Sequence, residues 1–172
     1  MKIYTIEAGN FKLDGGAMFG VVPKKLWQKT NPADEDNLIE MSCRCLLIEN
    51  ENRLILVDTG FGNKQSSKFF GHYKLWGKHS LENSFDKIGF CKDEITDVFL
   101  THLHFDHCGG SVIKSINQNG YEIAFKNAKY WTSKTGNQLV TYFDLDAQGY
   151  RTVSYTHLRA HETGRNLVCR LM

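Results

Sequence analysis

One short run limits this chain more than any other feature, because four side chains that can bind metal ions lie within six positions. They are His102, His104, Asp106 and His107. The apolar run Asp97–Leu100 before them predicts a β-strand, and a strand that leads into a loop directs alternate side chains to one side. The first two can therefore face one point, and the turn after Phe105 can bring the other two to a second point. The pair Gly109-Gly110 would let the backbone pass close below.

This set of side chains suits two metal ions. Neutral imidazoles favour tetrahedral zinc, whereas a carboxylate with an imidazole suits a second, harder site. Two ions a few ångströms apart can share a hydroxide and polarise a carbonyl or phosphoryl oxygen of a substrate. A chance cluster of solvated histidines is the alternative, but the complete pattern after an apolar strand is far more specific than three histidines alone. The run therefore predicts a two-metal hydrolytic site.

Two segments of the sequence resemble the metallo-β-lactamase-fold hydrolases. A predicted strand ends in Asp-Thr-Gly at Leu54–Gly60, and a second runs into Thr-His-x-His-x-Asp-His-x-Gly-Gly at Thr101–Gly110. The resemblance implies an α/β protein, an αββα four-layer sandwich with two zinc ions in a cleft at one edge.

The same resemblance implies roles for five residues. His102 and His104 would bind the first zinc ion. Asp106 and His107 would bind the second. Asp58, at the end of the preceding strand, would lie behind the ligands and orient the metal-binding loop. Asp106 would also act in catalysis, by positioning the attacking hydroxide and helping to transfer its proton to the leaving alkoxide.

Within this family the chain looks most similar to the lactonase-like branch, which includes enzymes that open N-acyl-homoserine lactones. The features are Phe105 between two ligands and the segments Asp14–Gly20 and Ala128–Ser133. The expected partner is a small-molecule ester or lactone, hydrolysed by a hydroxide that two zinc ions activate. Alternatives are a same-fold hydrolase of a thioester, phosphodiester or β-lactam, an iron-dependent oxidoreductase on the same scaffold, or a non-catalytic metal-binding module. Fold does not decide the substrate.

The family also needs a third histidine for the first ion, an aspartate that bridges both ions and a last histidine for the second. Later positions that offer such side chains are Asp144, Asp146, His157 and His161. We reject the two histidines, because Val153–Thr163 resembles one translated frame of a common transposase sequencing adapter. Asn166–Leu171 resembles the flow-cell end of the same adapter. The two aspartates then lack a following histidine.

These matches predict that residues 1–152 are the N-terminal portion of a metallo-β-lactamase-fold domain and that residues 153–172 are a non-native tail. Because the second half of the sandwich would be absent, we expect an apolar face of the sheet to be exposed. We expect the polypeptide as written to fold poorly, to bind metal weakly and to be inactive, although its parent protein is expected to be an enzyme.

Patterning along the rest of the chain predicts further elements. Strands are expected at Lys2–Glu7, Met41–Glu49, Arg53–Val57, Asp97–Leu100 and Ala124–Trp131, with a hairpin turn at Asn50–Asn52. Turns or loops are expected at Asp14–Gly16, Gln28–Asn37 and Phe61–Gly77, the last with a short helix. Ser80–Ile88 has helical spacing, with Ser80 as N-cap and Gly89 as the stop. Ser111–Ile116 is expected to begin another helix.

Other histidines, cysteines and aromatic residues have simpler explanations. His72 and His79 lack ligand-like spacing and are expected at the surface. Cys43 and Cys45 alternate along a strand and would face the same side, while Cys108 is expected to pack within the metal loop. Seven large side chains would suit an acyl-chain pocket, but packing is the simpler expectation: Met18, Phe19, Phe61, Phe69, Phe70, Tyr73 and Trp76.

Length and composition set the remaining limits. A chain of 172 residues is long enough for one domain with a sizeable core. Scattered basic residues and a net charge of +2 predict no nucleic-acid partner. No apolar stretch approaches the roughly 20 residues that span a bilayer, so no membrane partner is expected. Five cysteines without a CxxC pair, and no secretory leader, indicate reduced thiols in a cytoplasmic protein.

Overall fold

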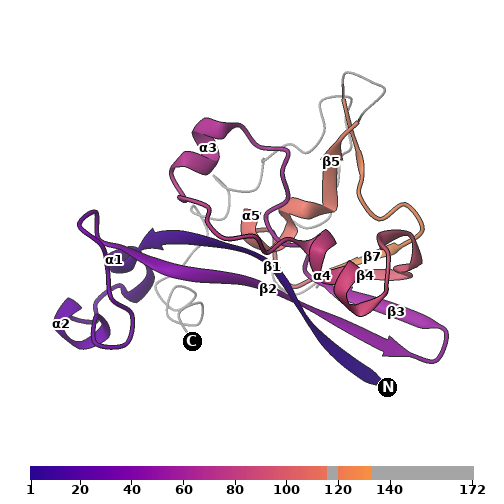
Figure 1. Cartoon of the computed structure of the whole chain (residues 1–172), viewed down its shortest axis with the longest axis horizontal. Helices are drawn as coiled ribbons and strands as arrows, with labels where there is room; N and C mark the ends of the chain where they lie inside the picture. Colours follow the sequence, from indigo (N-terminus) through magenta and orange to yellow (C-terminus); the bar gives the residue numbers. More distant parts are fainter. Residues whose placement is uncertain (116–119, 133–172) are drawn as a thin grey trace.

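A mixed five-stranded sheet organises the computed structural model, which describes residues 1–115 and 120–132. Its strand order is β1-β2-β3-β4-β7 (Figure 1). The strands are β1 (Lys2–Asp14), β2 (Leu38–Asn50), β3 (Arg53–Val57), β4 (Asp97–Leu100) and β7 (Lys129–Thr132). The first three are antiparallel neighbours, whereas β4 runs parallel to both β3 and β7. The predicted α/β class is confirmed, and the described residues form this sheet, its helices and a second sheet of two strands.

Strands β1 and β2 form a long ribbon that extends beyond the rest of the sheet. They pair from Lys2↔Glu49 to Asp14↔Leu38, whereas β3 pairs only with the last part of β2. The far end of the ribbon therefore projects and carries the short helices α1 (Gly15–Phe19) and α2 (Lys24–Trp27) (Figure 1). The hairpin expected between β2 and β3 is confirmed, with Glu51 at a positive φ of 53°.

The turn expected at Asp14–Gly16 is the start of helix α1. The side chain of Asp14 accepts a hydrogen bond from the backbone N–H of Ala17 (2.7 Å), which is the N-cap interaction that favours a helix over a simple turn. Gly15 packs against Trp27, since a Cβ added there would lie 2.4 Å from its ring.

Two helices connect β3 to β4. Helix α3 (Ser67–Gly71) is the short helix expected after Phe61, and Ser66 caps it. Helix α4 (Leu81–Ile88) is confirmed with the predicted ends: the Ser80 hydroxyl accepts from Asn83 N–H, and Gly89 takes a left-handed conformation. Helix α4 buries Phe85 and is tied to β1, because Ser84 Oγ donates to the carbonyl oxygen of Glu7 (2.8 Å).

The helix expected from Ser111 is wrong. A short 3-10 turn, η1 (Lys92–Glu94), precedes β4. After β4 the chain forms helix α5 (Phe105–Cys108) and a second 3-10 turn, η2 (Gly109–Ser111), and then enters strand β5 (Val112–Lys114). This strand pairs with β6 (Tyr121–Ile123). Val112 and Ile113 are β-branched, and the pairing partner decides in favour of the strand.

The strand expected at Ala124–Trp131 begins only at Lys129. Ala124 and Phe125 are instead buried in the core, where Ala124 N–H donates to the carbonyl oxygen of Ser111 (2.9 Å). Their apolar character therefore reflects burial in a turn, which a linear pattern does not separate from a strand.

The two faces of the sheet differ in cover. One face buries the core, with Ile6, Leu47, Leu56, Val98 and Leu100 all fully buried. The other face leaves apolar side chains open to solvent: Ile3 is 59% exposed, Phe99 39% and Trp131 40%. The register places Phe99 and Trp131 beside one another on adjacent strands. The exposed apolar face that we predicted is therefore present. Among the helices that the structure describes, none is long and apolar enough to cross a membrane.

A buried carboxylate ties three strands together at one end of the sheet. Asp97 accepts two hydrogen bonds from the guanidinium of Arg53 (2.7 and 3.0 Å) and one from the indole N–H of Trp131 (2.6 Å). The Thr96 hydroxyl donates a further one (2.7 Å). The Arg53 guanidinium, aided by Thr96 and Trp131, outweighs burial and holds the pKa of Asp97 well below its usual range.

We predict that Asp97→Asn lowers the free energy of unfolding and removes part of its acid dependence. Because the folded pKa of Asp97 is depressed, its contribution is complete above its unfolded pKa of about 4 and is lost as the pH falls toward the folded value. Thermal unfolding of the full-length gene product at about pH 7 and about pH 3 measures this effect. Asp86→Asn, on an exposed position of α4, is the matched control. An equal deficit of the Asp97 variant at both pH values would contradict the prediction.

Candidate metal centre

The four predicted ligands come together where β4 ends. The chain forms one helical turn, α5, directly after His104, because the N–H groups of His107 and Cys108 both donate to the carbonyl oxygen of His104 (3.0 and 2.9 Å). The ring centroids of His102 and His104 lie 4.7 Å apart, and those of His102 and His107 lie 4.0 Å apart. Nε2 of His107 is 3.5 Å from Oδ2 of Asp106. All four side chains are half-buried, so a small ligand can approach them.

Asp58 holds this loop from behind. It follows β3 directly, with a left-handed φ of 60° that aspartate tolerates better than most residues. Its carboxylate accepts from the N–H and hydroxyl of Thr101 (2.8–2.9 Å) and from Nδ1 of His107 (2.8 Å). Burial would raise the pKa of Asp58, but these hydrogen bonds outweigh burial and lower it. Asp58 therefore has the contacts expected of a residue that orients the loop.

The contact with Asp58 also defines the state of His107. Since Nδ1 donates to a carboxylate, Nε2 is the ring nitrogen that faces Asp106 and would be the one available to a metal ion. Burial lowers the pKa of His107, but the hydrogen bond to Asp58 and the charge of Asp106 raise it by more. Three imidazoles and a carboxylate, with a carboxylate behind one imidazole, form a set that suits zinc.

This set is incomplete within residues 1–115 and 120–132. No group of three or more His, Cys, Asp or Glu there is arranged to hold an ion by itself. The positions considered for further ligands, Asp144, Asp146, His157 and His161, lie outside the described residues. The ligand roles of the loop residues therefore remain predictions that rest on their chemistry and proximity.

Two glycine-containing loops meet backbone to backbone beneath the site. Thr59 N–H donates to the carbonyl oxygen of His107 (2.7 Å), and Gly110 N–H donates to that of Gly60 (2.9 Å). A Cβ on Gly110 would lie 2.1 Å from the carbonyl oxygen of Thr59, and one on Gly109 would lie 2.4 Å from that of Phe61. The close approach expected at the glycine pair is confirmed.

Sequence reasoning missed several contacts that fix the loop. The Cys43 thiol donates to the carbonyl oxygen of Asp106 (3.0 Å), so one of the two strand thiols lies directly under a predicted ligand. Phe105 packs against Tyr73 (ring centroids 4.3 Å apart), Phe69 (5.2 Å) and Phe11 (6.3 Å). The aromatic residues after Phe61 therefore anchor α5 in this structure, as the packing explanation expected. In the sequence, only the high number of aromatic residues between Phe61 and Gly77 indicated that this segment packs against another part of the chain.

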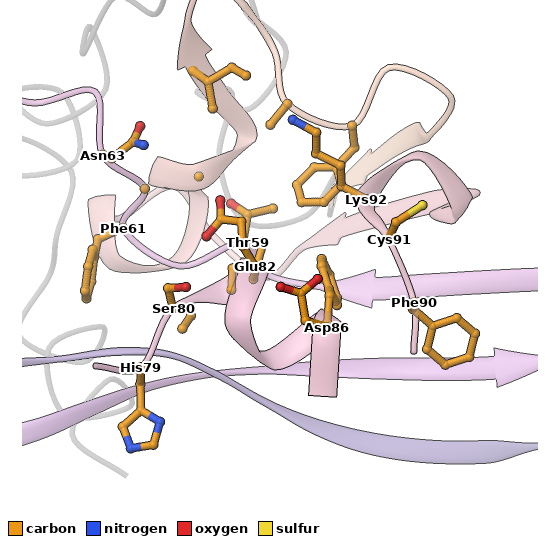
Figure 2. Close-up of a pocket in the computed structure, with 18 residues that line it drawn as sticks. Thr59, Phe61, Asn63, His79, Ser80, Glu82, Asp86, Phe90, Cys91 and Lys92 are labelled. Atoms are coloured by element: carbon orange, nitrogen blue, oxygen red, sulfur yellow. The ribbon is translucent and has the colours of Figure 1, made fainter. Parts of the chain in front are cut away.

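A cavity of about 410 Å³ lies next to helix α4 (Figure 2). Its lining includes Ser80, Glu82 and Asp86 of the α4 region, together with Thr59 and Phe61. None of the five predicted site residues lines it. The cavity therefore shares a wall with the loop below the metal centre but does not contain the predicted ligands.

The two histidines expected at the surface are exposed. His72 follows helix α3, and the ring of His79 points away from Thr59 and Glu82 in Figure 2.

Sequence comparisons find similar proteins over the part of the chain that contains this loop. Residues 38–113 match the model of the metallo-beta-lactamase superfamily. The N-acyl homoserine lactonase AiiA of Bacillus thuringiensis subsp. kurstaki is 26% identical over 145 residues, which are 75% of this chain and 53% of that protein. A "probable metallo-hydrolase" of Mycobacterium tuberculosis is 34% identical over 82 residues, 42% of this chain and 26% of that protein.

Solved structures give the same answer for the fold. A probable metal-dependent hydrolase from Staphylococcus aureus superimposes with a TM-score of 0.66 and 35% identity, over 75% of this chain and 45% of its own. AidC, a dizinc quorum-quenching lactonase, gives 0.56 and 27%, over 77% and 41%. The chain thus spans about half the length of the curated lactonase relatives it matches. The sequence match over residues 38–113 and these two solved structures agree that the chain is similar to part of a metallo-beta-lactamase domain.

We predict that Gly110→Ala destabilises the protein by about 1–3 kcal/mol, the usual cost of overpacking, because the new Cβ collides with a backbone oxygen that cannot turn away. Gly71→Ala is the matched control, since nothing lies within 4 Å of its Cβ position. At that helical position alanine should be neutral or stabilising by up to about 1 kcal/mol. Chemical unfolding of both variants measures the difference, and equal stabilities would refute the close packing.

We predict that Asp58→Asn weakens metal binding by about 10–100-fold while the fold persists. Asparagine tolerates the left-handed backbone of Asp58, but it lacks the charge that orients His107. Competition titration with a chromophoric chelator gives the affinity, with Asp93→Asn at an exposed position as the control. Unchanged metal affinity in the Asp58 variant would show that the loop holds its shape without this carboxylate.

Proposed function

We propose that this chain provides the metal-binding half of a metal-dependent hydrolase that opens a lactone or a related small ester. The observation that carries the proposal is the convergence of three histidines and an aspartate above the buried carboxylate of Asp58. The lactonase relatives support the substrate class, since they cover three quarters of this chain.

The residues divide into two pairs. His102 and His104 would hold one ion, and Asp106 with His107 would hold the other. When bound, zinc ions at these positions supply Lewis-acid polarisation of the ester carbonyl and activation of water. Imidazole rings and a carboxylate at this spacing also match the chemistry of zinc better than that of calcium or magnesium, which prefer oxygen ligands.

Asp106 has a second role in this proposal. Its carboxylate lies at the edge of the ligand set, 3.5 Å from Nε2 of His107, and its own backbone is held by the Cys43 thiol. From this position it would accept a proton from the attacking water and pass it to the alkoxide that leaves when the ring opens. His107, oriented by Asp58, would keep the neighbouring metal position fixed while the proton moves.

We predict that Asp106→Asn and His104→Ala each lower kcat/KM for an N-acyl homoserine lactone by about a hundredfold or more in the full-length gene product. Loss of a metal contact removes several kcal/mol of transition-state stabilisation, and each 1.4 kcal/mol is about tenfold in rate. His72→Ala, at an exposed histidine, is the control for removing an imidazole. Initial rates measured together with metal content separate lost chemistry from lost metal.

The same assay discriminates between substrates. A panel with a thioester, a phosphodiester and a β-lactam beside the lactone identifies the class that the full-length product turns over fastest. Faster turnover of another member would replace the lactone in this proposal. Full lactone hydrolysis after chelation, or a protein that contains no metal, would overturn the metal mechanism itself.

We also infer that residues 1–152 constitute the natural part of the chain and that residues 153–172 do not contribute to the site. The tail lies outside the described residues, so the uninterrupted gene sequence is the test. The free thiols of Cys43, Cys45 and Cys91 support a reducing compartment, for which the cytoplasm is our proposal.

A further inference from the structure

A lysine is buried directly behind the predicted metal loop. Lys64 is only 6% exposed, although lysine is seldom buried without a specific partner. It lies four positions after Gly60, in the loop that leaves β3. Its ammonium group donates a hydrogen bond to the carbonyl oxygen of Gly109, which is 45 positions away in the sequence.

The acceptor of this hydrogen bond is closely linked to the ligands. Gly109 is the C-cap of α5, the one-turn helix that carries Asp106 and His107. The last carbonyl groups of a helix lack partners within the helix, and a lysine ammonium is well suited to bind them. Lys64 therefore holds the far end of the same short turn whose side chains face the metal position.

The loop that carries Lys64 packs closely against the C-terminal end of α5. A Cβ on Gly62 would lie 2.7 Å from the carbonyl oxygen of Gly109, so the two backbones are in contact beside the ammonium group. Burial lowers the pKa of Lys64, and the nearby Cys108 acts against that shift. Removing the ammonium would leave the Gly109 oxygen buried without this donor, and an unsatisfied buried carbonyl is costly.

The other contacts to this turn show why the one from Lys64 matters. Asp58 holds the His107 ring, Thr59 holds the His107 carbonyl, and Cys43 holds the Asp106 carbonyl. All three fix the turn near its centre. Among the described residues, Lys64 instead donates to a carbonyl oxygen at the C-terminal end of the turn, where it would limit the tilt of α5 about the other anchors.

We propose that Lys64 is a positioning residue of the metal centre: by holding the Gly109 carbonyl, it fixes the direction in which Asp106 and His107 present their ligand atoms to the second ion. This inference rests on the proposed function, because it requires an ion at that position. Lys64 itself touches neither the ion nor the substrate.

The test is stepwise metal binding to the full-length gene product. Lys64→Met keeps the length and apolar stem of the side chain but removes the donor, and Lys64→Arg keeps a charged donor. Lys68→Met, at an exposed position of α3 in the same connection, is the matched control. The readouts are the two stepwise dissociation constants for zinc, the visible spectrum of the cobalt form, and the thermal midpoint of the metal-free protein.

We expect Lys64→Met to weaken the second zinc by about tenfold or more, with a smaller effect on the first, and to change the cobalt spectrum. We expect Lys64→Arg to recover most of the lost affinity and Lys68→Met to match the wild type. A purely structural role would instead weaken the binding of both ions alike, because it would act only through the lower stability of the metal-free protein. Should Lys64→Met not fold, Lys64→Leu, which also lacks a donor, takes its place with the same threshold.

Two results would overturn the inference and are distinguishable from one another. If the wild type binds two zinc ions and Lys64→Met binds them equally well with an unchanged cobalt spectrum, Lys64 does not position the ligands, and the proposed function stands. If the wild type binds no metal, the proposed function fails and the role of Lys64 fails with it.

Discussion

The metal loop depends on the hydrogen bonds of one buried carboxylate. Asp58 ends β3 in a left-handed conformation and accepts hydrogen bonds from both Thr101, at the end of β4, and His107, in α5. Because β3 and β4 are parallel neighbours, their carboxyl ends lie at the same edge of the sheet, and Asp58 joins them there. The loop at this edge is thereby tied to the ends of two central strands of the sheet.

Around this contact, the rest of the structure supports the loop by several kinds of interaction. Aromatic packing holds Phe105, a thiol donor from β2 holds the Asp106 carbonyl, and paired backbones hold the Gly109-Gly110 segment. Metal-binding side chains must be held close to their working geometry before the ion arrives, since disorder in the ligands reduces affinity. In this structure the loop is held in place by contacts from other elements, so its own sequence does not have to be rigid.

The features that could be predicted from the sequence were those that depend on residues close together in the chain. The ligand run, the glycine pair and the ends of α4 depend on neighbours within a few residues, so their patterns are visible in the chain itself. Lys64 and Cys43 could not be found this way, because their roles come from backbone atoms that only strand pairing brings near. The helix expected at Ser111 failed for a different reason: the strand that follows it pairs with β6, which begins nearby at Tyr121, and the pattern of the segment alone does not show that pairing.

If the loop binds metal as proposed, the long sequence separation between the loop and its supports would link ion capture to chain closure. Asp58 and His107 are 49 positions apart, and Lys64 and Gly109 are 45 apart. Closing such segments has an entropic cost that grows as about (3/2)RT ln n with their length n. An ion that met an unfolded chain would find the neighbouring side chains of positions 102–107 without their anchors. Part of the free energy of binding would therefore drive the ordering of the sheet edge, and the fraction of folded molecules would rise with the concentration of available metal.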